Sequence, residues 1–420
     1  MENNQDFSLW MASLSIYRGI LNRTVPKALY RLLCAVNGTA QEFLEAWGSF
    51  FSLLSERGYS DNLAGCLTES ALYDENIFSR WAAGTQEKPL SPTVMDAVKR
   101  DLSVICKLAS VTPEQLIDAF SQKKMTQEVS ETLPRWQTGT FDSRIDPEDL
   151  DGSAARMAEY YRKNGCGIYA RYRAFVWRNG SLEPVPYPDP IRLSGLKGYD
   201  YQRSLAVDNT VAFLEGLSAN NCLLYGDRGT GKSSTVKALL NEYYTEGLRM
   251  VEMPKESLGD FSKLVEKIAP LPLKFIVFID DLSFSQQDDT FAALKAVLEG
   301  GVASRPDNTL IYATSNRRHL VRETFSDRMG DEVHASDTMQ ESLSLADRFG
   351  LAINFTTPDR ARFLEIVRAL AEERGIEEDM RLIEAGAERW ATERGGRSPR
   401  CAKQYITVVE ARLKRGLPLA

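Results

Sequence analysis

The stretch Gly226-Asp227-Arg228-Gly229-Thr230-Gly231-Lys232-Ser233 decides the fold of this chain of 420 residues. It fits the phosphate-loop pattern G-x-x-x-x-G-K-[ST], and it lies between an apolar run at 221–225 and a helical pattern at 233–244. Glycines leave the backbone free enough for its N–H groups to surround a triphosphate. The helix that follows presents the positive end of its dipole to the phosphates. The motif therefore predicts a nucleotide site, whereas the alternative is a glycine-rich turn without a ligand.

The loop also predicts that a nucleoside triphosphate binds together with Mg²⁺. Lys232 is expected to contact the β and γ phosphates, and Ser233 is expected to ligate the magnesium ion. The residues that we expect to bind the nucleotide are Gly226, Asp227, Arg228, Gly229, Thr230, Gly231, Lys232, Ser233 and Ser234.

A second apolar run, Phe275-Ile276-Val277-Phe278-Ile279, ends in the carboxylates of Asp280 and Asp281. Ligands of open parallel sheets gather at the carboxyl ends of the strands, so this pair is expected beside the phosphate loop, as a Walker B motif. Asp280 would hold magnesium through water or Ser233. Asp281 would act as the general base that polarises the attacking water. A polar strand end without function is the alternative reading of this pair.

The stretch 309–316 contains another buried strand, expected at Thr309 to Ala313, and it finishes on Asn316, whose amide is placed to orient the lytic water. The order of phosphate loop, paired carboxylates and asparagine resembles the AAA+ ATPase superfamily, in which Asn316 corresponds to sensor 1. In that superfamily the second carboxylate is usually glutamate, so Asp281 implies slower hydrolysis. Arg317, Arg318 and His319 either read the state of the γ-phosphate or cap the turn.

The segment 341–351 resembles the part of AAA+ proteins that carries the arginine finger, with Arg348 as the candidate. A finger must be a permanently protonated cation that reaches the charge on the γ-phosphate. In the superfamily this arginine serves the neighbouring subunit, so the resemblance implies a homo-oligomer with a finger in trans. Arg328 is the second candidate, and a surface pair of Asp347 with Arg348 is the alternative.

Two further segments carry the resemblance. In 395–404, an N-cap serine and a first-turn proline precede Arg400, which corresponds to sensor 2 and links the nucleotide to the position of a lid; Arg397 is its alternative. The segment 193–202 resembles the adenine-side segment of the superfamily. The resemblance covers about 191–417, and within the superfamily it points to a bacterial family of AAA+ ATP-binding proteins that belongs to the domains of unknown function.

The fold class predicted is α/β, a P-loop AAA+ parallel sheet core with a C-terminal helical lid, preceded by a mainly helical N-terminal domain. Asn179-Gly180 closes a strand that begins near Tyr169 and is a strong hairpin signal. The expected regions are a helical domain at 1–127, an acidic linker and short helix at 128–165, a β-hairpin at 166–190, the AAA+ core at 191–356 and the lid at 357–420.

Composition limits the remaining possibilities. The net charge of −7 gives no bulk attraction to nucleic acid or to an anionic membrane, so any such binding would have to be local. The six cysteines are scattered and there are only two histidines, which favours reduced thiols and no zinc site. No apolar run is long enough for a membrane span, and the first residues are acidic and polar, unlike a secretory signal. We therefore expect a cytoplasmic protein without a membrane partner.

Three functions fit these features. The first is an ATP-hydrolysing AAA+ protein that couples the nucleotide state between subunits to remodelling of a macromolecular partner. The second is a loader or initiator that acts on nucleic acid. It is motivated by the similarity of the segment at 347–350 to replication initiators, and by a basic C-terminal helix with Arg400, Lys403, Arg412, Lys414 and Arg415. The third is a protein-remodelling chaperone or regulator recruited by the N-terminal domain. The sequence leaves the substrate and the oligomer size open.

Overall fold

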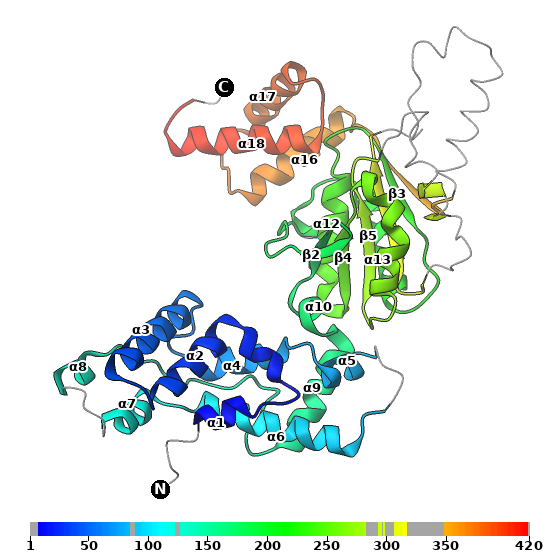
Figure 1. The fold of residues 1–420 in the computed structure, drawn as a ribbon. Coiled ribbons are helices and arrows are strands. Elements are labelled where there is room, and N and C mark those ends of the chain that lie inside the picture. Colours follow the sequence, from blue (N-terminus) through cyan, green and yellow to red (C-terminus); the bar gives the residue numbers. More distant parts are fainter. Residues whose placement is uncertain are drawn as a thin grey trace. The chain divides into compact units, whose positions relative to one another are not determined.

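The computed structural model describes residues 7–84, 89–121, 127–282, 293–295, 297–298, 306–316 and 348–418. The chain divides into two compact units, Met1–Arg171 and Tyr172–Ala420, each with its own core (Figure 1). The predictions for Arg317, Arg318, His319 and Arg328 lie outside the described residues.

The first unit is helical, as predicted. Its core includes two aromatic pairs, Phe43 stacked on Phe120 at 4.4 Å and Trp47 against Trp136 at 4.8 Å between ring centroids. Its helices are α1 (Phe7–Ala12), η1 (Arg18–Asn22), α2 (Thr24–Ala35), α3 (Ala40–Glu56), α4 (Leu63–Leu72), α5 (Ile77–Ala82), α6 (Pro92–Ala109), α7 (Pro113–Ser121), α8 (Gln127–Thr132), α9 (Leu150–Asn164) and α10 (Gly167–Arg171).

The acidic segment that we expected to be a linker packs into this first unit. Trp136 is buried and its indole N–H donates to the carbonyl of Val111 at 3.0 Å. Ile145 is also buried, and the Tyr161 hydroxyl of α9 donates to the carbonyl of Ala71 at 3.1 Å. The acidic residues serve local structure, since Asp149 caps α9. A few buried aromatic and aliphatic residues therefore anchor a segment whose average composition is polar.

The second unit contains a seven-stranded sheet in the order β2-β1-β4-β5-β6-β3-β7. All of its neighbouring strands are parallel except β1 and β2. The strands are β1 (Ala174–Arg178), β2 (Ser181–Pro184), β3 (Cys222–Gly226), β4 (Leu248–Glu252), β5 (Lys274–Ile279), β6 (Thr309–Ser315) and β7 (Leu351–Phe355). The helices between them are η2 (Leu193–Gly195), α11 (Asp200–Leu214), α12 (Lys232–Tyr243), η3 (Tyr244–Glu246), η4 (Lys255–Asp260) and α13 (Phe261–Ile268).

The hairpin β1–β2 is an extension of this sheet. It turns at Asn179-Gly180 as predicted, and β1 pairs in parallel with β4. The expected strand start near Tyr169 is instead helical, because α10 occupies Gly167–Arg171. The hairpin thus adds two strands at the β4 side of the sheet.

The sheet brings the ends of β3, β5 and β6 together. Both faces of β5 and β6 are buried, as is usual for parallel strands covered by helices. β3 lies between β6 and β7, so the chain leaves β3 at a point where the strand order reverses, the usual position of a ligand crevice. The fold class predicted from the sequence is confirmed.

Three helices form the C-terminal lid, and Figure 1 shows them grouped beyond one end of the sheet. They are α16 (Arg360–Glu373), α17 (Met380–Glu393) and α18 (Pro399–Lys414), and they share a small core around Phe363, Ile383 and Ile406. All six cysteines are free thiols, as predicted. In the part of the chain that the structure describes, no helix is both long and apolar enough to cross a bilayer.

Candidate nucleotide site

The phosphate loop joins β3 to α12, and its glycines adopt backbone angles that other residues rarely reach. The φ angles of Gly226, Gly229 and Gly231 are +126°, +77° and +99°. A Cβ atom at Gly226 would lie 2.3 Å from the carbonyl oxygen of Phe355. Gly226 is therefore required both by its φ angle and by the close approach of β7.

Lys232 opens α12 and its side chain lies inside the loop. Its ammonium group donates to the carbonyl oxygens of Gly226 at 2.9 Å and Asp227 at 2.6 Å, and to the Asn316 amide oxygen at 3.2 Å. Burial lowers the pKa of Lys232, and the carboxylates of Asp227, Asp281 and Asp280 oppose this shift. The ammonium group bonds to uncharged oxygens only, so an anion entering the loop would find a cation without a carboxylate partner.

Asp280 follows β5 and its carboxylate is held by two hydroxyl groups. Ser233 Oγ donates to Asp280 Oδ1 at 2.6 Å, and Thr314 Oγ1 donates to the same oxygen at 2.5 Å. The Ser233 hydroxyl and the Asp280 carboxylate thus lie side by side. Two such oxygens fit a magnesium ion, which takes one or two protein ligands together with phosphate oxygens and water.

Asp281 has a left-handed backbone, with φ of +53°. Its N–H donates to Thr314 Oγ1 at 3.0 Å, and its Oδ1 accepts from Asn316 Nδ2 at 2.5 Å. Aspartate and asparagine tolerate this conformation better than longer side chains do. The backbone therefore gives a physical reason for aspartate where the superfamily usually has glutamate.

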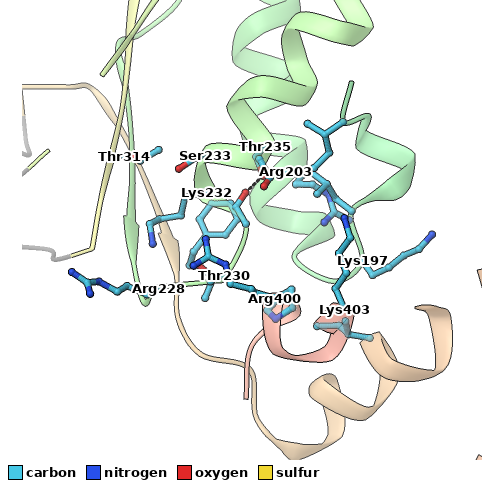
Figure 2. A pocket seen from close by; sticks show the side chains of 18 of the residues that line it. Lys197, Arg203, Arg228, Thr230, Lys232, Ser233, Thr235, Thr314, Arg400 and Lys403 are labelled. Carbon is cyan, nitrogen blue, oxygen red and sulfur yellow. Dashed lines mark hydrogen bonds between the residues drawn. The ribbon is translucent and has the colours of Figure 1, made fainter. Parts of the chain in front are cut away.

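Apart from Gly226 and Asp227, the residues described above line one cavity of about 620 Å³ (Figure 2). Two carboxylates, Asp280 and Asp281, and six basic side chains contribute to its wall; the basic ones are Lys197, Arg203, Arg228, Lys232, Arg400 and Lys403. Lys197 and Arg203 are paired with Glu373 and Asp200. By contrast, the side chains of Arg228, Arg400 and Lys403 have no hydrogen-bond or ion-pair partner among the described residues. The cavity therefore holds unneutralised positive charge, which suits a polyphosphate.

The wall of the cavity also includes apolar side chains. Leu196 comes from the adenine-side segment, Ile366 and Leu370 come from α16 of the lid, and Ile191 and Phe355 complete this part of the wall. A pocket whose wall combines apolar and cationic side chains suits a nucleotide, which joins a flat base to charged phosphates.

The lid reaches the phosphate loop through the first turn of α18. Ser398 caps this helix by accepting from the N–H of Cys401 at 3.2 Å, as predicted for an N-cap serine. The Arg400 N–H donates to the carbonyl of Gly229 at 3.2 Å, and its side chain lines the cavity. Arg397, the alternative, forms a two-pronged pair with Glu388, at 3.0 and 2.7 Å. Of the two arginines, Arg400 is the one at the cavity.

Arg348 does not line this cavity. It lies in the turn three residues before β7, whereas the phosphate loop follows the far end of β3, the parallel neighbour of β7. The five residues of β7 span about 16 Å. Arg348 and the phosphate loop therefore lie at opposite ends of the strands, Arg348 at the amino ends and the loop at the carboxyl ends.

The cavity contains residues that our sequence reasoning did not assign. Thr314 bonds to both Asp280 and Asp281, and its signal was the two-residue spacing to Asn316, which puts both on one face of the strand. Lys403 follows Arg400 by three residues, a spacing that places both on one face of α18. Lys197 and Arg203 had no comparable signal.

The geometry defines the class of protein. A phosphate loop and paired carboxylates meet at the carboxyl edge of a parallel sheet, under a helical lid whose arginine reaches the loop, and this is the architecture of a P-loop protein of the AAA+ class. The particular family is given by a match of residues 170–413, more than half of the chain, to the family described as Protein of unknown function (DUF815). The chain belongs to this family.

Solved structures show more distant likenesses. A RuvB from Thermotoga maritima, described as a Holliday junction branch migration motor, is 18% identical, with a TM-score of 0.37 over 54% of this chain and 66% of that chain. A variant of the same protein is 16% identical, with a TM-score of 0.38 and the same coverage. The match thus spans just under two thirds of the length of these RuvB chains. No curated protein matches the sequence.

Proposed function

We propose that this protein binds ATP with Mg²⁺ and hydrolyses it. The observation that supports the proposal is the convergence of Lys232, Ser233, Asp280, Asp281 and Asn316 in one cavity with surplus positive charge. Ser233 and Asp280 are the residues that would hold the magnesium ion. When bound, this ion supplies positive charge that stabilises the developing charge on the phosphate oxygens.

In this proposal several side chains of the protein have separate roles in hydrolysis. Lys232 neutralises the β and γ phosphates, and Asn316 orients a water molecule. Asp281 accepts a proton from that water while the water oxygen bonds to the γ-phosphorus. At the same time the bond between the γ-phosphorus and the oxygen that bridges the β and γ phosphates breaks, and ADP leaves. Arg400 and Lys403 contribute charge from the lid, so the position of the lid depends on the phosphates present.

The nucleotide cycle is proposed to drive remodelling of a macromolecular partner. The first unit has its own core and is a candidate for selecting that partner. The basic residues of α18 that motivated a nucleic-acid role have other places here, since Arg400 and Lys403 line the cavity and Lys414 pairs with Glu410 at 2.6 Å. We therefore favour a protein partner over nucleic acid.

The direct test measures ATP binding by calorimetry and phosphate release by the full chain, with and without Mg²⁺, alongside native mass measurements with and without ATP. We expect Mg²⁺-dependent binding, turnover and a larger assembly with ATP. Adding DNA or RNA at low salt separates the two partner classes, because strong stimulation would favour the nucleic-acid alternative. Absence of ATP binding by the folded chain would contradict the proposed function.

We further propose that Arg348 acts on the nucleotide of a neighbouring subunit. The proposal is supported by its position before the first residue of β7, whereas the phosphate loop follows the last residue of the parallel neighbour β3. Arg348→Ala is expected to lower ATP hydrolysis about a hundredfold or more, since trans-acting arginines contribute roughly 10³–10⁵ in rate. ATP binding should persist.

Mixing two inactive variants tests this assignment. Arg348→Ala combined with Asp281→Asn creates mixed assemblies in which some sites receive Asp281 from one subunit and Arg348 from the next. Partial recovery of hydrolysis in the mixture is the expected result. Arg381→Ala, which removes an exposed lid arginine, should behave like the unaltered chain. A mixture without recovery, although the subunits assemble, would exclude a finger in trans.

A further inference from the structure

The turn that joins β7 to the lid is bonded to the phosphate loop. Asp227, the second residue of that loop, accepts two hydrogen bonds on Oδ2, from the Thr357 N–H at 2.6 Å and the Thr357 hydroxyl at 2.7 Å. The Asp227 N–H also donates to the carbonyl of Phe355 at 2.9 Å. A single loop residue thus holds the chain at the point where it leaves the sheet for α16.

The same turn is held from its other side by Tyr199. The Tyr199 hydroxyl donates to the carbonyl of Thr356 at 2.5 Å, and its ring stacks on Phe355 at 5.2 Å between centroids. The turn at 355–357 is therefore fixed by the phosphate loop and by the adenine-side segment, the two parts of the core that would contact opposite ends of a nucleotide.

Asp227 is an unusual residue for a phosphate loop, because a free carboxylate there would repel the phosphates. The hydrogen bonds from the Thr357 backbone and side chain lower the pKa of Asp227, so the group is ionised at neutral pH. Ionised, it is the stronger acceptor for Thr357. The negative charge is thus directed to the lid turn.

Asp227 also contacts the cation that would bind the phosphates. Its carbonyl oxygen accepts from the Lys232 ammonium at 2.6 Å and from the Thr230 hydroxyl at 2.8 Å. A Lys232 that turns toward a triphosphate must weaken its bonds to the Gly226 and Asp227 carbonyls. Asp227 would therefore lose strength in its bond from Lys232 when a triphosphate binds, and the same residue is bonded to the turn before the lid.

We propose that Asp227 is a positioning residue that couples nucleotide binding at the phosphate loop to the position of the lid, through its two hydrogen bonds to Thr357. The inference rests on the proposed ATP site and adds its regulation. It differs from the contact between Gly229 and Arg400, which joins the loop to the far end of the lid through α18. Asp227 acts on the turn before α16, where a small change in backbone angles reorients the whole lid.

The test follows amide hydrogen exchange in α16 and α18 of the full chain, with and without ATP and Mg²⁺, beside calorimetry for ATP. In the unaltered chain ATP is expected to raise protection in the first turns of α16 about tenfold, a usual size for coupling between sites. Asp227→Ala, which removes both hydrogen bonds, should reduce that gain to about twofold. Thr357→Val removes only the hydroxyl bond and should reduce the gain by less, and the double variant should lose no more than Asp227→Ala alone, because Asp227→Ala already removes the bond that Thr357→Val breaks.

Two conservative variants keep the test informative if Asp227→Ala fails to fold. Asp227→Asn retains an acceptor without charge and should lose part of the gain, while Thr357→Ser retains the hydroxyl and should keep it. The matched control is Thr356→Val, which removes the hydroxyl of the exposed preceding residue and should leave the gain in protection unchanged.

The possible failures can be told apart. An unaltered chain that binds no ATP contradicts the proposed function, and the coupling with it. ATP binding without added protection in the lid overturns the coupling alone. An unchanged gain in Asp227→Ala and Thr357→Val likewise shows that the lid responds by another route.

Discussion

Replacing Lys232 with alanine is expected to weaken ATP binding about a hundredfold, because hydrogen bonds to charged groups contribute roughly 1.5–3 kcal/mol each and this ammonium would make at least two. Turnover should fall below detection. Lys232 is 6% exposed and bonds only to uncharged oxygens, so its charge is available to an anion in the loop. Calorimetry with ATP and a phosphate-release assay measure the two effects.

A second lysine of the same helix provides the control for Lys232. Lys237 lies on α12 and does not line the cavity. Lys237→Ala therefore changes the same residue type without touching the site, and it should bind and hydrolyse ATP like the unaltered chain. Unchanged ATP affinity in Lys232→Ala would show that the phosphate loop does not bind ATP.

Local sequence patterns were sufficient for the core strands. The apolar run at 275–279 was expected to be a strand and β5 is found at Lys274–Ile279, since a short apolar run that ends in two carboxylates leaves little freedom for its limits. The hairpin was recognised from Asn179-Gly180, but its parallel pairing with β4 was not. That pairing joins residues distant in sequence, and no periodicity within β1 specifies its partner. Burial of Trp136 in the first unit was missed for the same reason.

At the site, too, local motifs were predicted from the sequence, whereas contacts between residues distant in sequence were not. The loop residues and the pair Asp280 and Asp281 were predicted because each is a motif attached to its own strand. The hydrogen bonds from Thr357 to Asp227 and from Thr314 to Asp280 depend on which strands are neighbours. The sequence alone does not specify these contacts, and their roles in binding and hydrolysis stay predictions.

Replacing Asp281 with asparagine is expected to lower ATP hydrolysis by a factor of about 10² or more, since general bases contribute roughly 10²–10⁴ in rate. ATP affinity should change little. Asparagine tolerates the left-handed backbone of this position, where φ is +53°, and it has nearly the same shape. The substitution therefore removes the base while it leaves the turn after β5 in place. Single-turnover phosphate release and calorimetry separate the two quantities.

The control for Asp281 is Asp208→Asn, the same chemical change at an exposed position of α11, which should leave hydrolysis intact. Asp281→Glu adds a sharper test. If the rate were limited only by the distance from the carboxylate to the attacking water, the longer glutamate side chain would accelerate hydrolysis. The left-handed backbone disfavours glutamate, so we expect Asp281→Glu to hydrolyse ATP more slowly than the unaltered chain. Hydrolysis that persists in Asp281→Asn would mean that another group takes the proton, because this variant removes the carboxylate and keeps the backbone.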